Sequence, residues 1–585
     1  MDGPGIPAAE VLSLLRGTAL GAEASSETLA VLGAGARRAV ARSGDTIFHH
    51  GDQATTAYVL LSGRVQFVAT DRFGAETILG YLGPGEVFGA ASMFESGRRS
   101  VTAIAADACD LLAVDGDALF RAVAASKQLA FDLLAGFGRQ MKQAMNLHRG
   151  DKPATRVAVI RDRRGEGLVD ALAAGIAGYG LAVHRHRSGP ATGSPGGDLP
   201  PGTRRLTEWV SDGLTFPPLD YLTDYDRVLW VIPADARAEA EKSFREALAG
   251  NPVLAEKARI VWLLAPGERV GPPSPAVRDF KVPAPGAGRP DAVDRRAVGR
   301  VVRDVLGLRR GLALSGGGAK GMAHLGVLRA LDRAGIDFDL MAGTSGGALA
   351  GVPVAAGHDP DFCVTSFARD LTTPWHFRRL PRGKNLFLLW CFRAGRFDAM
   401  LRPYLHRWGL DQLPVPFSAL TVDLVTGREV VRDAGDAVHA ILESINVPGI
   451  AAPIVRGDQA LTDGGVLNNL PSDVLVAKGA GFVVGVDVTR RMRAESAGLT
   501  PGHPAAARPG SVETMFRVLE VLSSATNGQH VRAADLMIEP DTTTFGFADF
   551  DRTAALADAG ERAAEEALPR LRDALAAFER RVLAG

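Results

Sequence analysis

The sequence predicts a multidomain protein in which a β-rich N-terminal domain is followed by two α/β domains. Its 585 residues exceed the size at which a single hydrophobic core is usually stable. Between about residues 43 and 115, short β-rich runs are separated by glycines, which favours a β-sandwich or barrel. Two later regions alternate apolar runs with helical stretches, the order that builds a parallel sheet from βαβ units.

We expect domains at residues 18–150, 152–300 and 306–585. The middle domain carries no catalytic constellation, so we expect it to be a spacer or regulatory domain rather than a second active site. Two inserts rich in proline and glycine, residues 188–202 and 266–290, are predicted to be loops or linkers.

Two helical stretches are expected to pack against these domains. Residues 119–145 follow the β-rich runs directly and should cover that domain. The tail beyond about residue 511 is largely helical, and its apolar residues recur at helical spacing between charged ones. We therefore expect an amphipathic helix that covers the core of the last domain.

The composition excludes several classes of function. The 66 basic residues equal the 66 acidic ones, so no global field draws this chain onto nucleic acid. Cys109, Cys363 and Cys391 lie far apart, which disfavours disulfides or a zinc cluster. The first residues include Asp2 and Glu10 and lack the basic start of a secretion signal, and no window is apolar enough to span a membrane. We expect a cytoplasmic protein that touches membranes only from outside.

A nucleophilic serine is predicted at position 345. The run Gly343, Thr344, Ser345, Gly346, Gly347 fits G-x-S-x-G between an apolar run and a helical stretch. That context places a serine hydroxyl on a tight turn, where small neighbours let a substrate approach. The helix that starts after Ser345 directs its positive dipole end toward developing negative charge.

A serine hydroxyl needs a neighbouring base, and Asp463 is the candidate. It ends a short apolar run and precedes Gly464 and Gly465, whose missing side chains let another backbone come close. An ordinary Asp-Gly turn is the structural alternative when this motif is considered alone.

A third glycine motif, "LALSGGGAKGMAHLGVL", contains Gly316, Gly317 and Gly318 at the start of a predicted helix. Backbone N–H groups there would stabilise an oxyanion or a pyrophosphate. The dinucleotide alternative needs Asp337 or Asp339 as the ribose acid, but both precede the next apolar run instead of following it. The loop therefore favours an oxyanion.

Three segments together resemble the patatin-like phospholipase family: "SGGGAKGMAHLGVLRAL", "GTSGG" and "DGGVLNNLP". The resemblance covers about residues 306–568 and implies a three-layer α/β/α fold with a Ser-Asp catalytic pair. By that resemblance Ser345 is the nucleophile that forms an acyl-enzyme and Asp463 is its general base. The amides around the three glycines of the loop would form the oxyanion hole, and no metal or cofactor is needed.

Four other polar residues are alternative candidates for a role in the site: His324, Lys320, His503 and His530. A histidine-containing triad would use His503 or His530, neither of which has a supporting motif. His324 lies within the first predicted helix and is expected to be a packed residue. Lys320 is followed by glycine rather than serine or threonine, which argues against a Walker-type loop. It either lends charge near the oxyanion or is solvated.

Between the serine and the aspartate, residues 383–397 read "GKNLFLLWCFRAGRF". This apolar cluster is flanked by Lys384, Arg393 and Arg396. Two interpretations remain open: a lip that meets a lipid surface, or a segment buried in the core.

The N-terminal text "GEVFGAASMFESGRRSVTAIA" resembles the phosphate-binding cassette of cyclic-nucleotide-binding domains, which implies a β-roll. Arg99 and Ser100 stand where that family holds the cyclic phosphate. Ala90 replaces the glutamate that binds the ribose, and this loss weakens affinity about tenfold or more. We expect a degenerate scaffold or a weakly responsive regulator.

The combination of domains looks like the neuropathy target esterase branch, whose members deacylate phospholipids and lysophospholipids. The sequence therefore predicts a serine esterase with a lipid substrate, regulated through its N-terminal domain. The alternative is a signalling adaptor whose N-terminal domain binds a nucleotide or partner while the patatin-like part is idle.

Overall fold

The computed structural model divides the chain into two compact units, Met1–His148 and Arg149–Gly585. It describes residues 25–126, 153–188, 202–210, 224–238, 257–272, 277–284, 294–489 and 533–584, together with a few isolated residues between these ranges. Short gaps fall at positions 43, 71–75, 83, 91, 94–96, 100, 107 and 382. Each unit is described by itself.

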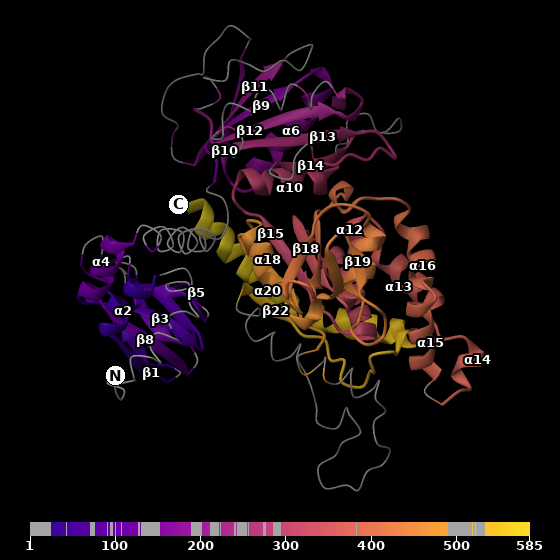
Figure 1. Ribbon diagram of the computed structural model, residues 1–585. Coiled ribbons are helices and arrows are strands. Elements are labelled where there is room, and N and C mark those ends of the chain that lie inside the picture. Colours follow the sequence, from indigo (N-terminus) through magenta and orange to yellow (C-terminus); the bar gives the residue numbers. More distant parts are fainter. Residues whose placement is uncertain are drawn as a thin grey trace. The chain divides into compact units, whose positions relative to one another are not determined.

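The first unit consists of two four-stranded antiparallel sheets, which confirms the β-rich fold expected for it (Figure 1). One sheet has the order β1-β8-β3-β6, with the bounds Ala36–Ala41, Cys109–Asp115, Thr56–Ser62 and Val87–Phe88. The other has the order β2-β7-β4-β5, with the bounds Thr46–Phe48, Thr102–Ala105, Val65–Thr70 and Glu76–Leu82.

Helices α2 (Ser26–Ala34) and α4 (Gly116–Ala125) pack on each other beside the first sheet. Each begins at a side-chain cap, Ser25 for α2 and Asp115 for α4, whose oxygens accept from free backbone N–H groups. Helix α4 is the start of the stretch predicted at 119–145, and most of the remainder lies outside the described residues.

The second unit begins with a six-stranded sheet that is parallel throughout, as the βαβ pattern predicts. Its order is β10-β11-β9-β12-β13-β14, with the bounds Ala182–Ser188, Thr203–Val210, Arg156–Arg161, Arg227–Pro233, Ala258–Leu264 and Arg278–Pro283. Helices α6 (Glu166–Ala177) and α10 (Arg295–Val305) pack against each other beside it.

The prediction that residues 266–290 form only a loop is wrong, because β14 lies within that insert. Residues 278–283 pair in parallel with β13 at the edge of the sheet. The flanking prolines and glycines gave a loop signal, but pairing with a neighbouring strand outweighs such local preferences.

The last part of the chain forms an eight-stranded sheet of order β19-β20-β17-β16-β15-β21-β22, with β18 paired to β17. The bounds are Ile454–Arg456, Gln459–Asp463, Phe417–Asp423, Leu340–Thr344, Arg310–Leu314, Phe482–Val486, Leu536–Ile538 and, for β18, Arg428–Arg432. Strands β17, β16, β15, β21 and β22 are parallel. Strands β18, β19 and β20 run antiparallel to their neighbours.

Apolar residues of this sheet alternate between two helical layers, as in an α/β/α fold. Leu312 and Leu314 face the larger core, whereas Ala313 between them faces the core beneath α18 (Ser472–Ala477). The larger core is covered by the helices α11 (Ala323–Arg333), α12 (Gly346–Ala355), α13 (Pro360–Asp370), α17 (Ala437–Ser444) and α20 (Thr553–Ala584).

Helix α20 is the amphipathic helix predicted for the tail (Figure 1). It packs closely on α11, and two glycines permit the approach. A side chain at Gly326 would come within 1.7 Å of the Ala557 carbonyl oxygen, and one at Gly560 within 1.9 Å of the Ala323 carbonyl oxygen. Because α11 follows the glycine loop directly, the packing of α20 on α11 also fixes the position of that loop.

Candidate active site

Ser345 lies on a strained turn between β16 and α12. Its backbone has φ 50° and ψ −117°, and it is one of two non-glycine residues with positive φ among those the structure describes. Such strain persists only where the surroundings hold it, and it is typical of a nucleophile that must project from the end of a strand. The side chain is buried, with 6% of its surface exposed.

The neighbouring glycines are required by close backbone contacts, as the motif predicts. A side chain at Gly343 would lie 2.7 Å from the Gly347 carbonyl carbon. One at Gly347 would lie 2.3 Å from the Leu314 carbonyl oxygen, and one at Gly346 2.7 Å from the Gly318 carbonyl oxygen. The turn that carries Ser345 and the glycine loop are therefore packed backbone against backbone.

Two hydrogen bonds fix the serine turn from other elements, and a third joins Asp463 to the segment after α17. The Ser345 N–H donates to Ser444 Oγ at the end of α17, over 2.9 Å. The Thr344 hydroxyl donates to the Asn468 carbonyl over 2.9 Å, which joins the turn to the loop after β20. The Asp463 N–H donates to the Asn446 carbonyl over 2.9 Å. The serine, the aspartate and the 444–446 segment thus form one connected structure.

Asp463 ends β20 and is buried beside Ser345. Burial raises the pKa of its carboxyl from 3.8 to about 6. The neighbouring Ser345 side chain and a hydrogen bond from the Gly465 N–H over 2.8 Å act in the opposite direction and lower the pKa. A buried carboxylate beside a serine hydroxyl is suited to take the proton of that hydroxyl.

The glycine loop lies next to this pair. Its first member, Gly316, has its N–H already engaged, because it donates to the Asn469 carbonyl over 3.0 Å. Within the described part of the chain, the N–H groups of Gly317 and Gly318 donate to no other backbone carbonyl. Of the three glycines predicted to form the oxyanion hole, only Gly317 and Gly318 therefore remain candidate donors.

Gly318 requires the absence of a side chain for two reasons. Its φ is +57°, in the left-handed region that favours glycine. A Cβ there would also lie 2.7 Å from the ring of Phe547, whose carbonyl accepts from the Ala319 N–H over 2.9 Å. The segment before α20 thus holds the loop in the conformation in which the Gly317 and Gly318 N–H groups donate to no backbone carbonyl of the described residues.

His324 and Lys320 are placed clearly. His324 is fully buried, and burial lowers its pKa to about 4, so the ring is neutral and its Nε2–H donates to the Ser315 carbonyl over 2.8 Å. It is the packed helix residue that the sequence predicts. Lys320 is 8% exposed, so the alternative of a solvated lysine is wrong.

Asp339, the rival candidate among the described residues, does not lie at this site. Asp339 accepts from the Arg303 guanidinium and from the Arg310 N–H at the beginning of β16, the end of the strand opposite to Ser345. His503 and His530 lie outside the described residues.

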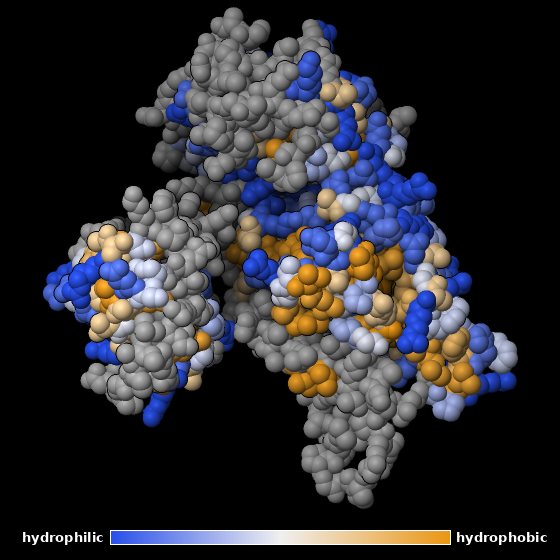
Figure 2. Space-filling view, in the orientation of Figure 1, coloured by the Kyte–Doolittle hydropathy of each residue, from blue (hydrophilic) through white to orange (hydrophobic). Residues whose placement is uncertain are grey.

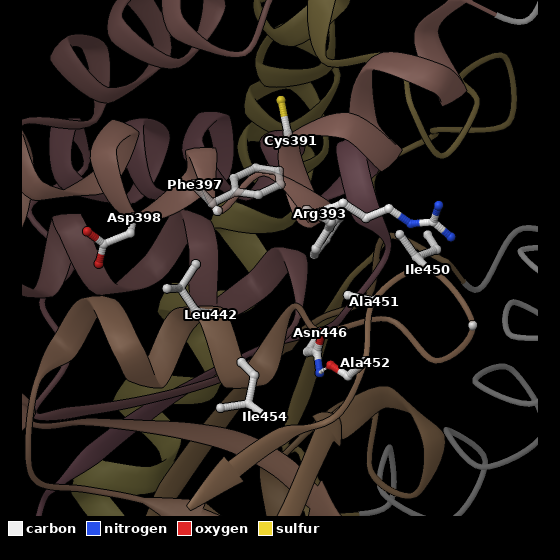
Figure 3. A pocket seen from close by; sticks show the side chains of 13 residues that line it. Cys391, Arg393, Phe397, Asp398, Leu442, Asn446, Ile450, Ala451, Ala452 and Ile454 are labelled. Carbon is white, nitrogen blue, oxygen red and sulfur yellow. Dashed lines mark hydrogen bonds between the residues drawn. The ribbon is translucent and has the colours of Figure 1, made fainter.

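A cavity of about 720 Å³ is lined in part by α17 and by Asn446, the segment that contacts Ser345 and Asp463, although neither of those two residues lines it (Figure 3). Asn446 lines it and also accepts from the Asp463 N–H, and Leu442 lines it from α17, whose Ser444 contacts Ser345. Most of the remaining lining is apolar and comes from α15 (Gly383–Arg393), α16 (Arg396–Leu405) and the 449–454 segment. A mostly apolar cavity with few polar groups is typical of a site for an apolar ligand.

The sequence did not single out Ser444, Asn446 or Asn469 as parts of this site. Asn469 stands within the quoted motif "DGGVLNNLP", six residues after Asp463, so a motif-based argument could have included it. Ser444 and Asn446 lie in "LESINVPG", where no local pattern marks them. Their role depends on the pairing of β20 with β17 and on the packing of α17.

In the N-terminal unit, Arg99 is buried with 3% exposure. Its guanidinium donates to the Gly89 and Thr56 carbonyls over 2.5 and 2.6 Å and lies 4.2 Å from the centroid of the Phe48 ring. The Arg99 guanidinium, predicted to contact a cyclic phosphate, is thus engaged by groups of the protein itself. Ser100 lies outside the described residues, and Ala90 is fully buried.

Comparison with known proteins agrees with the two recognised regions. Residues 312–476 match the family model described as patatin-like phospholipase, and residues 38–126 match the cyclic nucleotide-binding domain. An uncharacterized NTE family protein of Mycobacterium tuberculosis is 31% identical over 287 residues, which cover 46% of this chain and 48% of the relative. The chain thus spans about half the length of that relative.

Two further similarities cover shorter parts. The lysophospholipase NTE1 of Mycosarcoma maydis is 34% identical over 36% of this chain and 11% of its own length. A solved N-terminal domain of a transcriptional regulator from Streptomyces coelicolor is 31% identical over 23% of this chain and 93% of that chain, with a TM-score of 0.19. The chain thus carries one region that matches the patatin-like phospholipase family and one that matches the cyclic nucleotide-binding domain, and part of it is similar to NTE family proteins.

Proposed function

We propose that this protein is a serine esterase that hydrolyses the fatty-acyl ester bonds of lysophospholipids or phospholipids. The observation that supports it most strongly is the buried Asp463 carboxyl, whose pKa is raised to about 6 by burial and is influenced by the neighbouring Ser345 side chain. A base with a pKa near the working pH is present as carboxylate and still holds a proton well enough to deliver it.

In the proposed reaction, Ser345 Oγ attacks the ester carbonyl carbon while its proton passes to Asp463. The carbonyl oxygen becomes negative and accepts hydrogen bonds from the N–H groups of Gly317 and Gly318. The bond to the alcohol then breaks, and that alcohol leaves with the proton from Asp463. Water attacks the acyl-enzyme with Asp463 again as the base, and the fatty acid leaves.

The apolar cavity supports a substrate with an acyl chain. Its lining includes Phe392, Phe397, Leu442 and Ile450, and it adjoins the segment that contacts both Ser345 and Asp463. Burying a chain there removes apolar surface from water, which gains about 0.8 kcal/mol per methylene. We propose that this cavity holds the acyl chain during the reaction.

The test is release of fatty acid from lysophosphatidylcholine by the wild type and by Ser345→Ala. The proposal predicts that the variant loses activity at least about 10³-fold while it unfolds at the same temperature as the wild type. Equal rates would instead favour a signalling adaptor with an idle patatin-like domain.

A further inference from the structure

Helices α14 (Trp375–Arg378) and α15, together with the turn between them, carry apolar side chains that face solvent. Trp375 is 64% exposed, Leu380 49%, Leu386 42% and Trp390 43%. We call these four residues, with the arginines beside them, the α14–α15 surface. Figure 2 shows apolar residues gathered over these helices and bordered by hydrophilic ones. Contiguous exposed apolar area of this kind marks an interaction site.

The exposed side chains stand on a packed aromatic base. The ring centroids of Phe377 and Phe387 are 5.4 Å apart, and Trp390 lies 5.9 and 6.0 Å from them. Phe387 is buried, as is Cys391 on the same helix. Residues 383–397 are therefore partly core and partly surface. The interpretation as a buried segment holds for one side of α15, and contact of the other side with a lipid surface stays a prediction.

This surface is strongly cationic in a chain without net charge. Residues 375–397 contain six lysines and arginines and no acidic residue. Lys384 is committed to ion pairs with Asp549 and Asp551. Arg379 lies 4.7 Å from the centroid of the Trp375 ring.

Arg396 has a similar place, 5.3 Å from the centroid of the Trp390 ring. No carboxylate of the described residues pairs with either of these two arginines, so their charge is available to a partner. The two exposed indoles of the surface thus each have an arginine at their side.

The same helix links this surface to the apolar cavity. Leu386 and Trp390 of α15 face solvent, whereas Cys391, Phe392 and Arg393 line the cavity. In Figure 1 both helices lie at the periphery of their domain. A lipid that meets the surface is therefore close to the place where its acyl chain would be bound.

We propose that the α14–α15 surface docks this protein onto the face of an anionic phospholipid bilayer. Tryptophan side chains are favourable at the boundary between headgroups and acyl chains, where one end is apolar and the other is wet. Arginines beside them contact the lipid phosphates, and each basic side chain near an anionic surface adds to the attraction. This inference goes beyond ester hydrolysis, because docking does not require Ser345 to react.

A second copy of the chain is the main competing occupant. A two-fold symmetric dimer through this surface would place the same patch on both partners. Arg379 and Arg396 of one copy would then face those of the other without carboxylates between them, which is unfavourable. An anionic lipid surface instead complements their charge.

The test is flotation of the full chain with phosphatidylcholine vesicles, with and without phosphatidylserine. We compare the wild type with Trp375→Ser/Leu380→Ser and with Arg379→Gln/Arg396→Gln. Both pairs change exposed side chains, so unfolding temperature and hydrolysis of a dissolved short-chain ester should stay unchanged. We expect the wild type to bind only vesicles with phosphatidylserine, and each double variant to bind at least about tenfold more weakly.

Matched controls are Val40→Ser and Arg572→Gln, an exposed apolar residue and an exposed arginine on other elements, which should bind as the wild type does. The proposal is overturned if the wild type does not float with anionic vesicles, if the double variants bind equally, or if phosphatidylserine makes no difference. It is also overturned if sedimentation shows that the wild type and the control variants are dimers while the double variants are monomers. Ester hydrolysis is measured separately, so either proposal can fail alone.

Discussion

The Ser345 side chain lowers the pKa of the neighbouring Asp463 carboxyl, and no cationic group contributes to that pKa. Burial alone therefore accounts for the rise of that pKa, and the charge of the carboxylate is stabilised only by the Ser345 side chain and the Gly465 N–H. This arrangement leaves the carboxylate basic enough to take a proton from its neighbour.

Activity should depend on pH through Asp463. The carboxylate is the reactive form, and burial raises its pKa to about 6. We expect kcat/KM for a dissolved ester to be level above pH 7 and to fall about tenfold per unit well below pH 6. A profile measured from pH 4.5 to 8 checks this, and a level profile down to pH 4.5 would exclude Asp463 as the base.

Asp463 should also reduce stability at neutral pH. Its folded pKa lies above the ordinary 3.8, so ionisation is disfavoured in the folded state. The resulting penalty is absent below pH 3.8, grows between pH 3.8 and 6, and is complete above about pH 6. The difference between a pKa of 3.8 and one of about 6 corresponds to roughly 3 kcal/mol of free energy of unfolding.

The uncharged Asp463→Asn variant should therefore unfold at a higher temperature than the wild type at pH 8, and at nearly the same temperature at pH 4. Thermal unfolding at both pH values measures the difference. A variant less stable than the wild type at pH 8 would show that the hydrogen bonds of Asp463 outweigh its desolvation.

The glycine loop should tolerate no side chain at Gly318. Gly318→Ala strains a φ of +57° and pushes a methyl group to 2.7 Å from the Phe547 ring. Displacing an oxyanion donor lowers kcat by about 10²- to 10³-fold. The control is Gly335→Ala, which has a φ of +69° but open space around its Cβ position.

We expect the control to lose about 1 kcal/mol of stability and to retain full activity. Steady-state kinetics on both variants makes the comparison. Equal kcat for Gly318→Ala and the wild type would remove the loop from the proposed mechanism.

Cyclic nucleotides should bind weakly or not at all. A nucleotide phosphate would have to draw Arg99 away from two backbone carbonyls and from the Phe48 ring, and Ala90 offers no carboxylate to the ribose. Calorimetric titration with cyclic AMP and cyclic GMP should show no heat of binding at micromolar ligand. A dissociation constant in that range, with a change in ester hydrolysis, would establish the N-terminal domain as a nucleotide sensor.

The parallel sheet of residues 156–283 should unfold together with the patatin-like part. Asp304 is buried and holds Arg259 of β13 and Arg278 of β14 over 2.9 and 3.0 Å, and these arginines keep the pKa of Asp304 below its usual range. Lys281 donates to the Asp411 carbonyl over 2.8 Å. Removal of one partner of a buried ion pair costs about 3–5 kcal/mol.

Asp304→Ala should therefore lower the unfolding temperature of the whole second unit in a single calorimetric transition. Asp332→Ala removes an exposed ion pair with Arg296 and should change it little. Separate transitions for the parallel sheet and the patatin-like part would contradict this prediction. The boundary predicted at residues 300–306 stays a prediction.

The serine turn was predictable because its determinants are local. Gly343, Ser345 and Gly347 lie within one turn, and the structure explains each glycine by a backbone contact that a side chain would block. Asp463 was predictable from its own glycines together with the other motifs. The parallel pairing in the sheet of residues 156–283 likewise follows from the alternation of apolar runs and helices, whereas the order of its strands was not predicted.

Other features depend on contacts between residues distant in sequence. The N–H of Gly316 pairs with Asn469, which no spacing within the glycine loop indicates. Strand β14 has a loop-like composition and forms because β13 offers it an edge. The burial of Lys320 and the internal bonds of Arg99 likewise depend on surrounding elements.

The described residues also include no helix long and apolar enough to cross a membrane.

The activation of Ser345 by Asp463 is tested most directly by labelling with a fluorophosphonate and mapping the modified residue by mass spectrometry. We expect one label per chain, on Ser345, and a labelling rate at least about 10²-fold lower in Asp463→Asn. A label on another residue, or an equal rate in the wild type and Asp463→Asn, would contradict that activation.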